Sequence, residues 1–148
     1  MTLIDANVLL YAYDSESPFQ KASARWLETE LSSGRSVSFA LVTLLAFVRI
    51  ASDRRVFSRP LTPAEACSLI EGWLALPNAR LLQPGPRTWK ILSEVCGSGQ
   101  ARGPMVMDAH LAALALEHGA SITTTDRDFT RFPGIDLMDP TEATSHQA

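Results

Sequence analysis

One segment of the chain places a helix, a stop signal and a strand in direct succession: MVMDAHLAALALEHGASITTTD, residues 105–126. Residues 105–118 carry a helical pattern, and Gly119 is the residue type that ends a helix because it tolerates a left-handed backbone. Residues 121–124 form a short strand-like run just before Asp126. The segment therefore predicts a helix that leads into a strand with an acidic residue beyond its end.

The remainder of the chain repeats this alternation of short strands and helices. Further strands are expected at 2–4, 36–39, 79–82 and 135–137, and further helices from about residue 6 and over 18–31, 40–52, 63–76 and 87–96. The nearly all-apolar pattern of 40–52 predicts a buried helix. Strands that alternate with helices are typical of a parallel sheet between helical layers.

The sequence thus predicts an α/β domain with a three-layer α/β/α sandwich. Its central sheet is expected to be mostly parallel and to contain four to five short strands. One domain at 1–140 is expected because ordinary domains run to roughly 100–150 residues, with a polar tail at 141–148.

The composition excludes several classes of protein. Of the 148 residues, 46% are hydrophobic and 20% charged, which is near the globular average and excludes a disordered chain. A net charge of −3 argues against a broad basic surface for non-specific nucleic-acid binding. Neither a signal-peptide pattern nor an apolar run of about 20 residues is present, so we expect a cytoplasmic protein with no membrane partner.

Acidic residues follow two of the predicted strands. Asp5 comes directly after the first strand, and Asp126 and Asp128 follow the strand at 121–124. Ligands of parallel α/β sheets bind beyond the carboxyl ends of the strands, so these acids are candidates for one shared site. Asp5 equally suits a purely structural role, because Asp is a common N-cap of helices.

Asp108 lies within the apolar stripe of its predicted helix. At about 100° per residue, Leu111 and Ala115 lie within about 60° of Asp108 around the helix axis. Burying an unpaired carboxylate costs several kcal/mol, so Asp108 needs a cation, hydrogen-bond donors or a proton. An arginine partner and a metal ion shared with Asp5 and Asp126 both meet that need.

The kind of metal follows from the residues near these acids. No Cys/His cluster accompanies them in the sequence, and an all-carboxylate site suits Mg²⁺ or Mn²⁺ rather than zinc. Such an ion activates water and offsets the charge that develops on a phosphorane. The acids therefore point to metal-dependent hydrolysis of phosphodiesters.

Three segments resemble the acidic motifs of PIN domains in order and spacing: LIDANVL at 3–9, MDAHLAALA at 107–115 and TTDRDF at 124–129. More narrowly, the chain resembles the VapC toxins of bacterial type II toxin–antitoxin systems, from residue 1 to about 140. The resemblance implies a PIN-like fold and a Mg²⁺- or Mn²⁺-dependent endoribonuclease that acts on RNA. It also implies a homodimer and a cognate VapB-type antitoxin that threads a segment into the active-site groove.

The resemblance assigns roles to individual residues. The catalytic acids would be Asp5, Asp108, Asp126 and Asp128. The first three of these would be metal ligands, and the fourth an auxiliary acid. The residues that orient ligands and waters would be Asn7 and Thr124. The candidate contacts to RNA are Arg49, Arg102 and Arg127.

One position departs from the family's pattern. The family usually has a Glu early in the helix after the second strand, and this chain has Ala46 there, in AFVR at 46–49. The remaining acids support a single hydrated ion and do not predict a second metal. Thr43, one turn before Ala46, would at best hold a water bound to the ion.

Two other functions compete with metal-dependent cleavage. Because Ala46 replaces the usual Glu, a PIN-like module that binds RNA or an antitoxin with weak or no catalysis also fits the sequence. A phosphotransferase with Asp5 as nucleophile is a third hypothesis, since Asp5-Ala6-Asn7 resembles the Asp-x-Asp of haloacid-dehalogenase-type enzymes. It is the weakest of the three, because Asn7 stands where those enzymes have a general acid.

Overall fold

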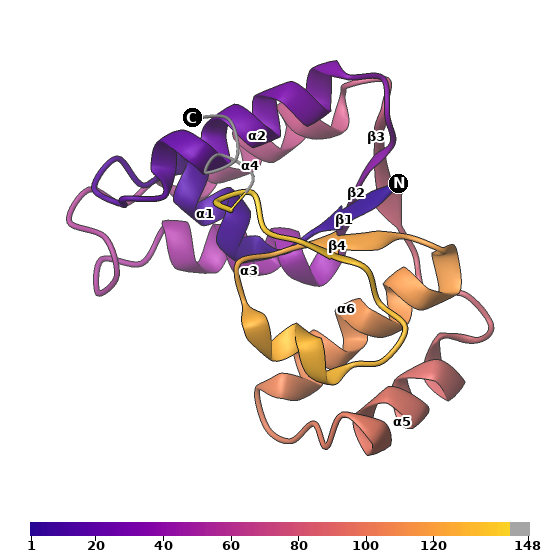
Figure 1. Cartoon of the computed structure of the whole chain (residues 1–148). Helices are drawn as coiled ribbons and strands as arrows, with labels where there is room; N and C mark the ends of the chain where they lie inside the picture. The colour runs from indigo at the N-terminus through magenta and orange to yellow at the C-terminus, as the bar shows by residue number, and fades with distance from the viewer. Residues whose placement is uncertain (143–148) are drawn as a thin grey trace.

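Five parallel strands form the centre of the computed structural model, which describes residues 1–142 (Figure 1). They are β1 (Thr2–Ile4), β2 (Val37–Ala40), β3 (Ala79–Leu82), β4 (Ser121–Thr123) and β5 (Leu137–Met138). Their order across the sheet is β3-β2-β1-β4-β5, and each neighbouring pair is parallel. In the central pair Ile4 lies opposite Thr123, so the carboxyl ends of β1 and β4 lie side by side.

Helices lie on both sides of this sheet (Figure 1). One side carries α1 (Ala6–Tyr13), α2 (Gln20–Ser32), α3 (Leu41–Ala51) and α4 (Pro63–Leu74), and the other carries α5 (Thr88–Ser98) and α6 (Met105–His118). Two separate clusters of buried side chains result: Ile4 packs with the first group, whereas its neighbour Leu3 packs with the second. Because β1 is buried on both faces, helices must cover the sheet on both sides. The predicted three-layer sandwich is confirmed.

Helix ends follow specific sequence signals. The Thr62 side chain accepts a hydrogen bond from the Glu65 backbone N–H at 3.1 Å, and the Glu65 carboxylate accepts one from the Thr62 N–H at 3.1 Å. This capping box fixes the start of α4. Gly119 ends α6 with a φ of 67°, a left-handed conformation that favours glycine.

The prediction that the helix at 40–52 is buried is wrong for one of its faces. Leu44 and Phe47 of α3 are buried against the sheet, but Leu41 is 56% exposed and Leu45 is 60% exposed. A helix as apolar as this one, with only Thr43 and Arg49 as polar residues, has little hydrophobic periodicity to show which face meets the core. The outer face of α3 therefore presents large apolar side chains to the surroundings.

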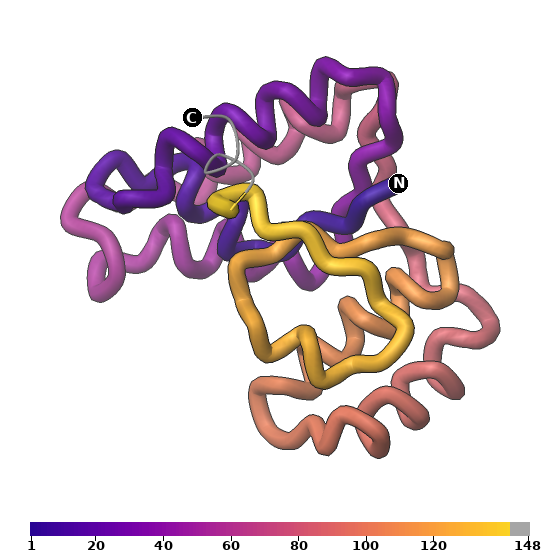
Figure 2. Tube along the Cα trace, viewed as in Figure 1, coloured from indigo at the N-terminus to yellow at the C-terminus, as the bar shows by residue number. Residues whose placement is uncertain are grey.

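The chain returns across the sheet after β4. A short 3-10 helix, η1 (Arg127–Arg131), follows β4, and the chain then runs back to pair β5 with β4 (Figure 2). The tail predicted at 141–148 falls mostly on residues 143–148, which lie outside the described residues. Within 1–142, no helix is both long enough and apolar enough to cross a membrane.

Candidate active site

A cavity of about 500 Å³ opens where β1 passes into α1. Its walls are one stripe of α3 and the first turns of α6, and the turn after β1 contributes Asp5 and Ala6. Asp5 and Asp108, which are 103 positions apart in the sequence, thus line a single cavity. The cavity therefore lies at the carboxyl end of β1, where ligand sites of parallel α/β sheets are found.

Asp5 is the most buried acid of the site. Its residue is only 9% exposed, and burial raises the pKa of its carboxyl above the usual value. The carboxylate accepts a hydrogen bond from the Ala6 N–H at Oδ1, 2.8 Å away, and another from the Thr124 hydroxyl at Oδ2, also 2.8 Å away. Both hydrogen bonds lower the pKa and so partly offset the burial. Asp5 is therefore the N-cap of α1, which is the structural role that the sequence also allowed, and it lines the cavity as well.

Thr124 ties Asp5 to the residues after β4. Its hydroxyl oxygen accepts hydrogen bonds from the Asp126 backbone N–H at 3.0 Å and from Nδ2 of Asn7 at 3.3 Å. The side-chain oxygen of Asn7 in turn accepts from the Thr125 N–H at 3.4 Å. Asn7 and Thr124 thus form a small network behind Asp5 that joins the ends of β1 and β4.

Asp126 and Asp128 lie at the start of the short helix η1 that follows β4. The Oδ1 atom of Asp126 accepts a hydrogen bond from the Asp128 N–H at 2.9 Å, which makes Asp126 the N-cap of η1. Both carboxylates act electrostatically on Asp108 and raise its pKa. The structure therefore places the four predicted acids near one another, although only Asp5 and Asp108 line the cavity itself.

Asp108 is half-buried on the first turns of α6 and has a strongly perturbed pKa. Burial is the main cause, and the negative charges of Asp5, Asp126 and Asp128 add to it, so that the pKa of Asp108 rises to about 6. Arg131 opposes this rise. In the described part of the chain Asp108 forms no ion pair with an arginine, and the charge of Arg131 does not prevent the rise of its pKa, so the predicted arginine partner does not satisfy this carboxylate.

The donor set fits a hydrated ion better than an ion held by protein alone. Among residues 1–142, no three Asp, Glu, His or Cys side chains lie close enough together to hold a metal ion between them. Mg²⁺ usually keeps several waters and needs only one or two carboxylates and a substrate phosphate. Asp5 and Asp108 supply two carboxylates, and Thr43 lines the same cavity with a buried hydroxyl that has no hydrogen-bond partner among residues 1–142. These hard oxygen donors suit Mg²⁺ or Mn²⁺ with its waters.

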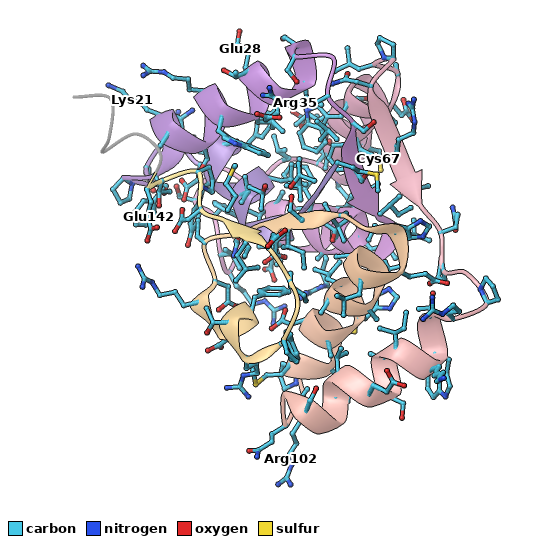
Figure 3. All side chains as sticks on the ribbon, turned by 45° about the vertical axis from the view of Figure 1, so that its right-hand side comes forward. Lys21, Glu28, Arg35, Cys67, Arg102 and Glu142 are labelled. Atoms are coloured by element: carbon cyan, nitrogen blue, oxygen red, sulfur yellow. The ribbon has the colours of Figure 1, made fainter. Side chains whose placement is uncertain are left out.

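The three arginines predicted to contact RNA lie in different surroundings. Arg49 lines the cavity with Asp5 and Asp108. Arg102 projects from the loop between α5 and α6 away from the rest of the molecule (Figure 3). Arg127 forms an ion pair with Glu142, with 2.7 Å between the guanidinium nitrogen and the carboxylate oxygen. Only Arg49 is therefore brought to the cavity.

Arg131 is the cation that the sequence analysis missed. It lies at the end of η1, and its charge lowers the pKa of Asp108. One of its guanidinium nitrogens donates to the Gly99 carbonyl at 3.3 Å. The sequence signal that could have identified Arg131 was its spacing of three residues from Asp128. Residues three apart share one face of a 3-10 helix, so an arginine at that spacing lies on the same side as the acid.

Comparison with known proteins gives the family. Residues 2–135 match the family described as the PIN domain. Ribonuclease VapC37 of Mycobacterium tuberculosis is 47% identical over 135 residues, which cover 91% of this chain and 94% of that protein. The chain is a VapC-type PIN domain ribonuclease. A second relative of this PIN domain, ribonuclease VapC31 of Mycobacterium tuberculosis, is 34% identical over 140 residues, or 95% of this chain and 99% of the relative.

The PIN fold is also shared with solved structures of low sequence identity. VapBC-1 from nontypeable Haemophilus influenzae superposes with a TM-score of 0.68 at 18% identity, covering 95% of this chain and 98% of the other. At that identity the likeness concerns the fold alone. The PIN fold predicted from the sequence is confirmed by both the family match and this superposition.

Proposed function

We propose that this PIN domain is the toxin of a toxin–antitoxin pair and cleaves RNA phosphodiester bonds at the cavity lined by Asp5 and Asp108. The observation that carries the proposal is the position of Asp108, a half-buried carboxylate that faces three other acids with no arginine paired to it. A carboxylate in such surroundings is stabilised by a bound cation. The relatives' names as ribonucleases support RNA as the substrate.

Asp5 and Asp108 would hold the ion directly, and Asp126, the third ligand that the family resemblance implies, would act with the auxiliary acid Asp128 through the waters of the ion. When bound, Mg²⁺ or Mn²⁺ supplies water activation and charge neutralisation at the phosphate. The chain's own contribution is orientation: the Thr124 hydroxyl fixes Oδ2 of Asp5, and its hydrogen bond partly offsets the rise that burial causes in the pKa of that carboxyl. Arg49, in the same cavity, supplies positive charge for the RNA backbone.

A VapB-type antitoxin and a homodimer complete the proposed assembly. Solved structures of the same fold include VapBC2 from Rickettsia felis and a toxin–antitoxin complex from Klebsiella pneumoniae, which supports an antitoxin for this chain. The homodimer and a cytoplasmic location rest on the family resemblance. Sedimentation of the purified chain alone tests the homodimer. Sedimentation of the chain with the product of a neighbouring short reading frame tests the antitoxin complex.

Cleavage is tested with purified protein, total RNA and MgCl₂ or MnCl₂. Asp5→Asn and Asp108→Asn should abolish cleavage, because each removes a carboxylate from the cavity. Asp136→Asn is the matched control, since Asp136 is exposed and does not line the cavity. The proposal fails if the wild-type chain leaves RNA intact with both ions, or if all three variants cleave equally well.

A binding module without catalysis is the second candidate. It is favoured by Ala46 and by the lack of a three-acid cluster within residues 1–142. Calorimetric titration with Mn²⁺ separates the two candidates. A cleaving enzyme should show binding that Asp108→Asn removes, whereas a non-catalytic module should show no carboxylate-dependent binding.

A further inference from the structure

The cavity beside the acids has apolar walls. The wall formed by α3 consists of residues at helical spacing on one face: Val42, Leu45, Ala46 and Arg49. The facing wall on α6 contributes Met107 and Leu111. Leu45 and Met107 are 60% and 52% exposed, so two large apolar side chains flank the opening of a cavity that also contains two carboxylates.

We propose that this cavity is a nucleobase subsite, which takes the base of a nucleotide whose phosphate lies at Asp5 and Asp108. The inference rests on the proposed cleavage of RNA and extends it by stating where a base would bind. Proteins recognise single-stranded RNA by splaying bases out of the stack into pockets. A base carries two apolar faces with polar edges, which matches apolar walls with a few polar groups.

Three features favour a base over other occupants. The cavity is continuous with the acids, so that a base bound there stays attached to a phosphate at Asp5 and Asp108. Arg49 supplies positive charge and a planar guanidinium on which a base can stack. The volume of about 500 Å³ lies within the usual range for small-molecule sites of about 300–1,000 Å³.

Ala46 gives this subsite its room. A Glu in its place, as the family resemblance leads one to expect, would fill part of the cavity and add a further negative charge beside Asp5 and Asp108. With Ala46 the α3 wall carries no acid at that position and leaves space for a neutral, flat group. The substitution that weakens the acid set is therefore the same one that opens the cavity.

The test compares ligands with and without a base, using the full chain in MgCl₂. The probes are the four nucleoside 5′-monophosphates and ribose 5-phosphate, with dissociation constants measured by NMR titration. At least one nucleotide should bind about tenfold more tightly than ribose 5-phosphate, a difference of about 1.4 kcal/mol. Equal affinity of all five probes would overturn the subsite.

Two leucines of α3 provide a matched pair of variants. Leu45→Ala removes part of the cavity wall, whereas Leu41→Ala removes an equally exposed leucine that does not line the cavity. Leu45→Ala should reduce the nucleotide preference to less than about threefold, and Leu41→Ala should leave it unchanged. Ala46→Leu, which fills the cavity from the same wall, should also abolish the preference.

The remaining outcomes identify other occupants or separate the two proposals. If Leu41→Ala and Leu45→Ala both dissociate a dimer and leave the nucleotide preference intact, this face binds a second copy and the subsite is wrong. If the wild-type chain cleaves RNA but binds all five probes alike, the proposed function stands and the subsite falls. Base-dependent binding without any RNA cleavage would instead overturn the proposed function and retain the subsite.

Discussion

Replacing Thr124 with valine removes the hydroxyl that holds Asp5 while keeping the shape of the side chain. That hydroxyl donates to Oδ2 of Asp5 at 2.8 Å and accepts from the Asp126 N–H at 3.0 Å and from Asn7 Nδ2 at 3.3 Å. A hydrogen bond to a charged group contributes about 1.5–3 kcal/mol and a neutral one about 0.5–1.5 kcal/mol. Taking the lower half of each range, because part of the network can reach water, we expect Thr124→Val to lower the free energy of unfolding by about 3 kcal/mol.

The assay is urea denaturation at pH 7 without metal, followed by circular dichroism. Thr125→Val is the control, because it makes the same chemical change one residue away, where the side chain makes no hydrogen bond within residues 1–142. It should change stability by no more than about 0.5 kcal/mol. A loss below about 1 kcal/mol for Thr124→Val, or an equal loss for both variants, would refute the role given to this network.

The remaining predictions concern the acids and one helix cap. The pKa of Asp108, about 6, lies above its ordinary value of 3.8. The stability of the metal-free protein should therefore fall as the pH rises from about 4 through 6, and the urea midpoints of Asp108→Asn should show less of that fall. Stabilisation by Mn²⁺, measured as a rise in Tm, should show the opposite trend and vanish near pH 5, where protons displace the ion. Ala46→Glu should tighten Mn²⁺ binding in calorimetry by adding a carboxylate to the cavity wall, and unchanged affinity would show that position 46 does not face the ion. Thr62→Ala should cost about 1 kcal/mol in urea denaturation by breaking the capping box, and no loss would mean that the cap contributes nothing.

The sequence predicted the features that local chemistry determines. Gly119 ends α6 as its residue type indicated, and short strands alternate with helices because each must bury its apolar face. The position of Asp108 within an apolar stripe correctly indicated a carboxylate with perturbed ionisation. The order of the motifs identified the family, because three acidic segments at fixed spacing are far more specific than one.

Features that depend on the approach of two helices could not be predicted. Apart from Thr43 and Arg49 the α3 pattern is apolar on every face, so the apolar residues themselves do not distinguish Phe47, which is buried, from Leu45, which borders a cavity. That difference arises only when α6 brings Met107 opposite α3. The same holds for Arg131, whose effect on Asp108 depends on where η1 folds back against α6. Distances between elements are set by packing, and no local pattern records them.

The acids of the site differ in what stabilises them, and this difference separates their roles. Asp5 has two hydrogen-bond donors, from Ala6 and Thr124, and Asp126 accepts from the backbone of Asp128, so both serve as helix caps. Asp108 accepts no such bond within the described residues, and its pKa is the one raised to about 6. The fold therefore supplies hydrogen-bond donors to Asp5 and Asp126, whereas the half-buried carboxylate of Asp108 has no donor within residues 1–142 and is opposed only by the charge of Arg131. Since a bound cation would relieve this cost, the free energy of metal binding should depend more on Asp108 than on either capping acid.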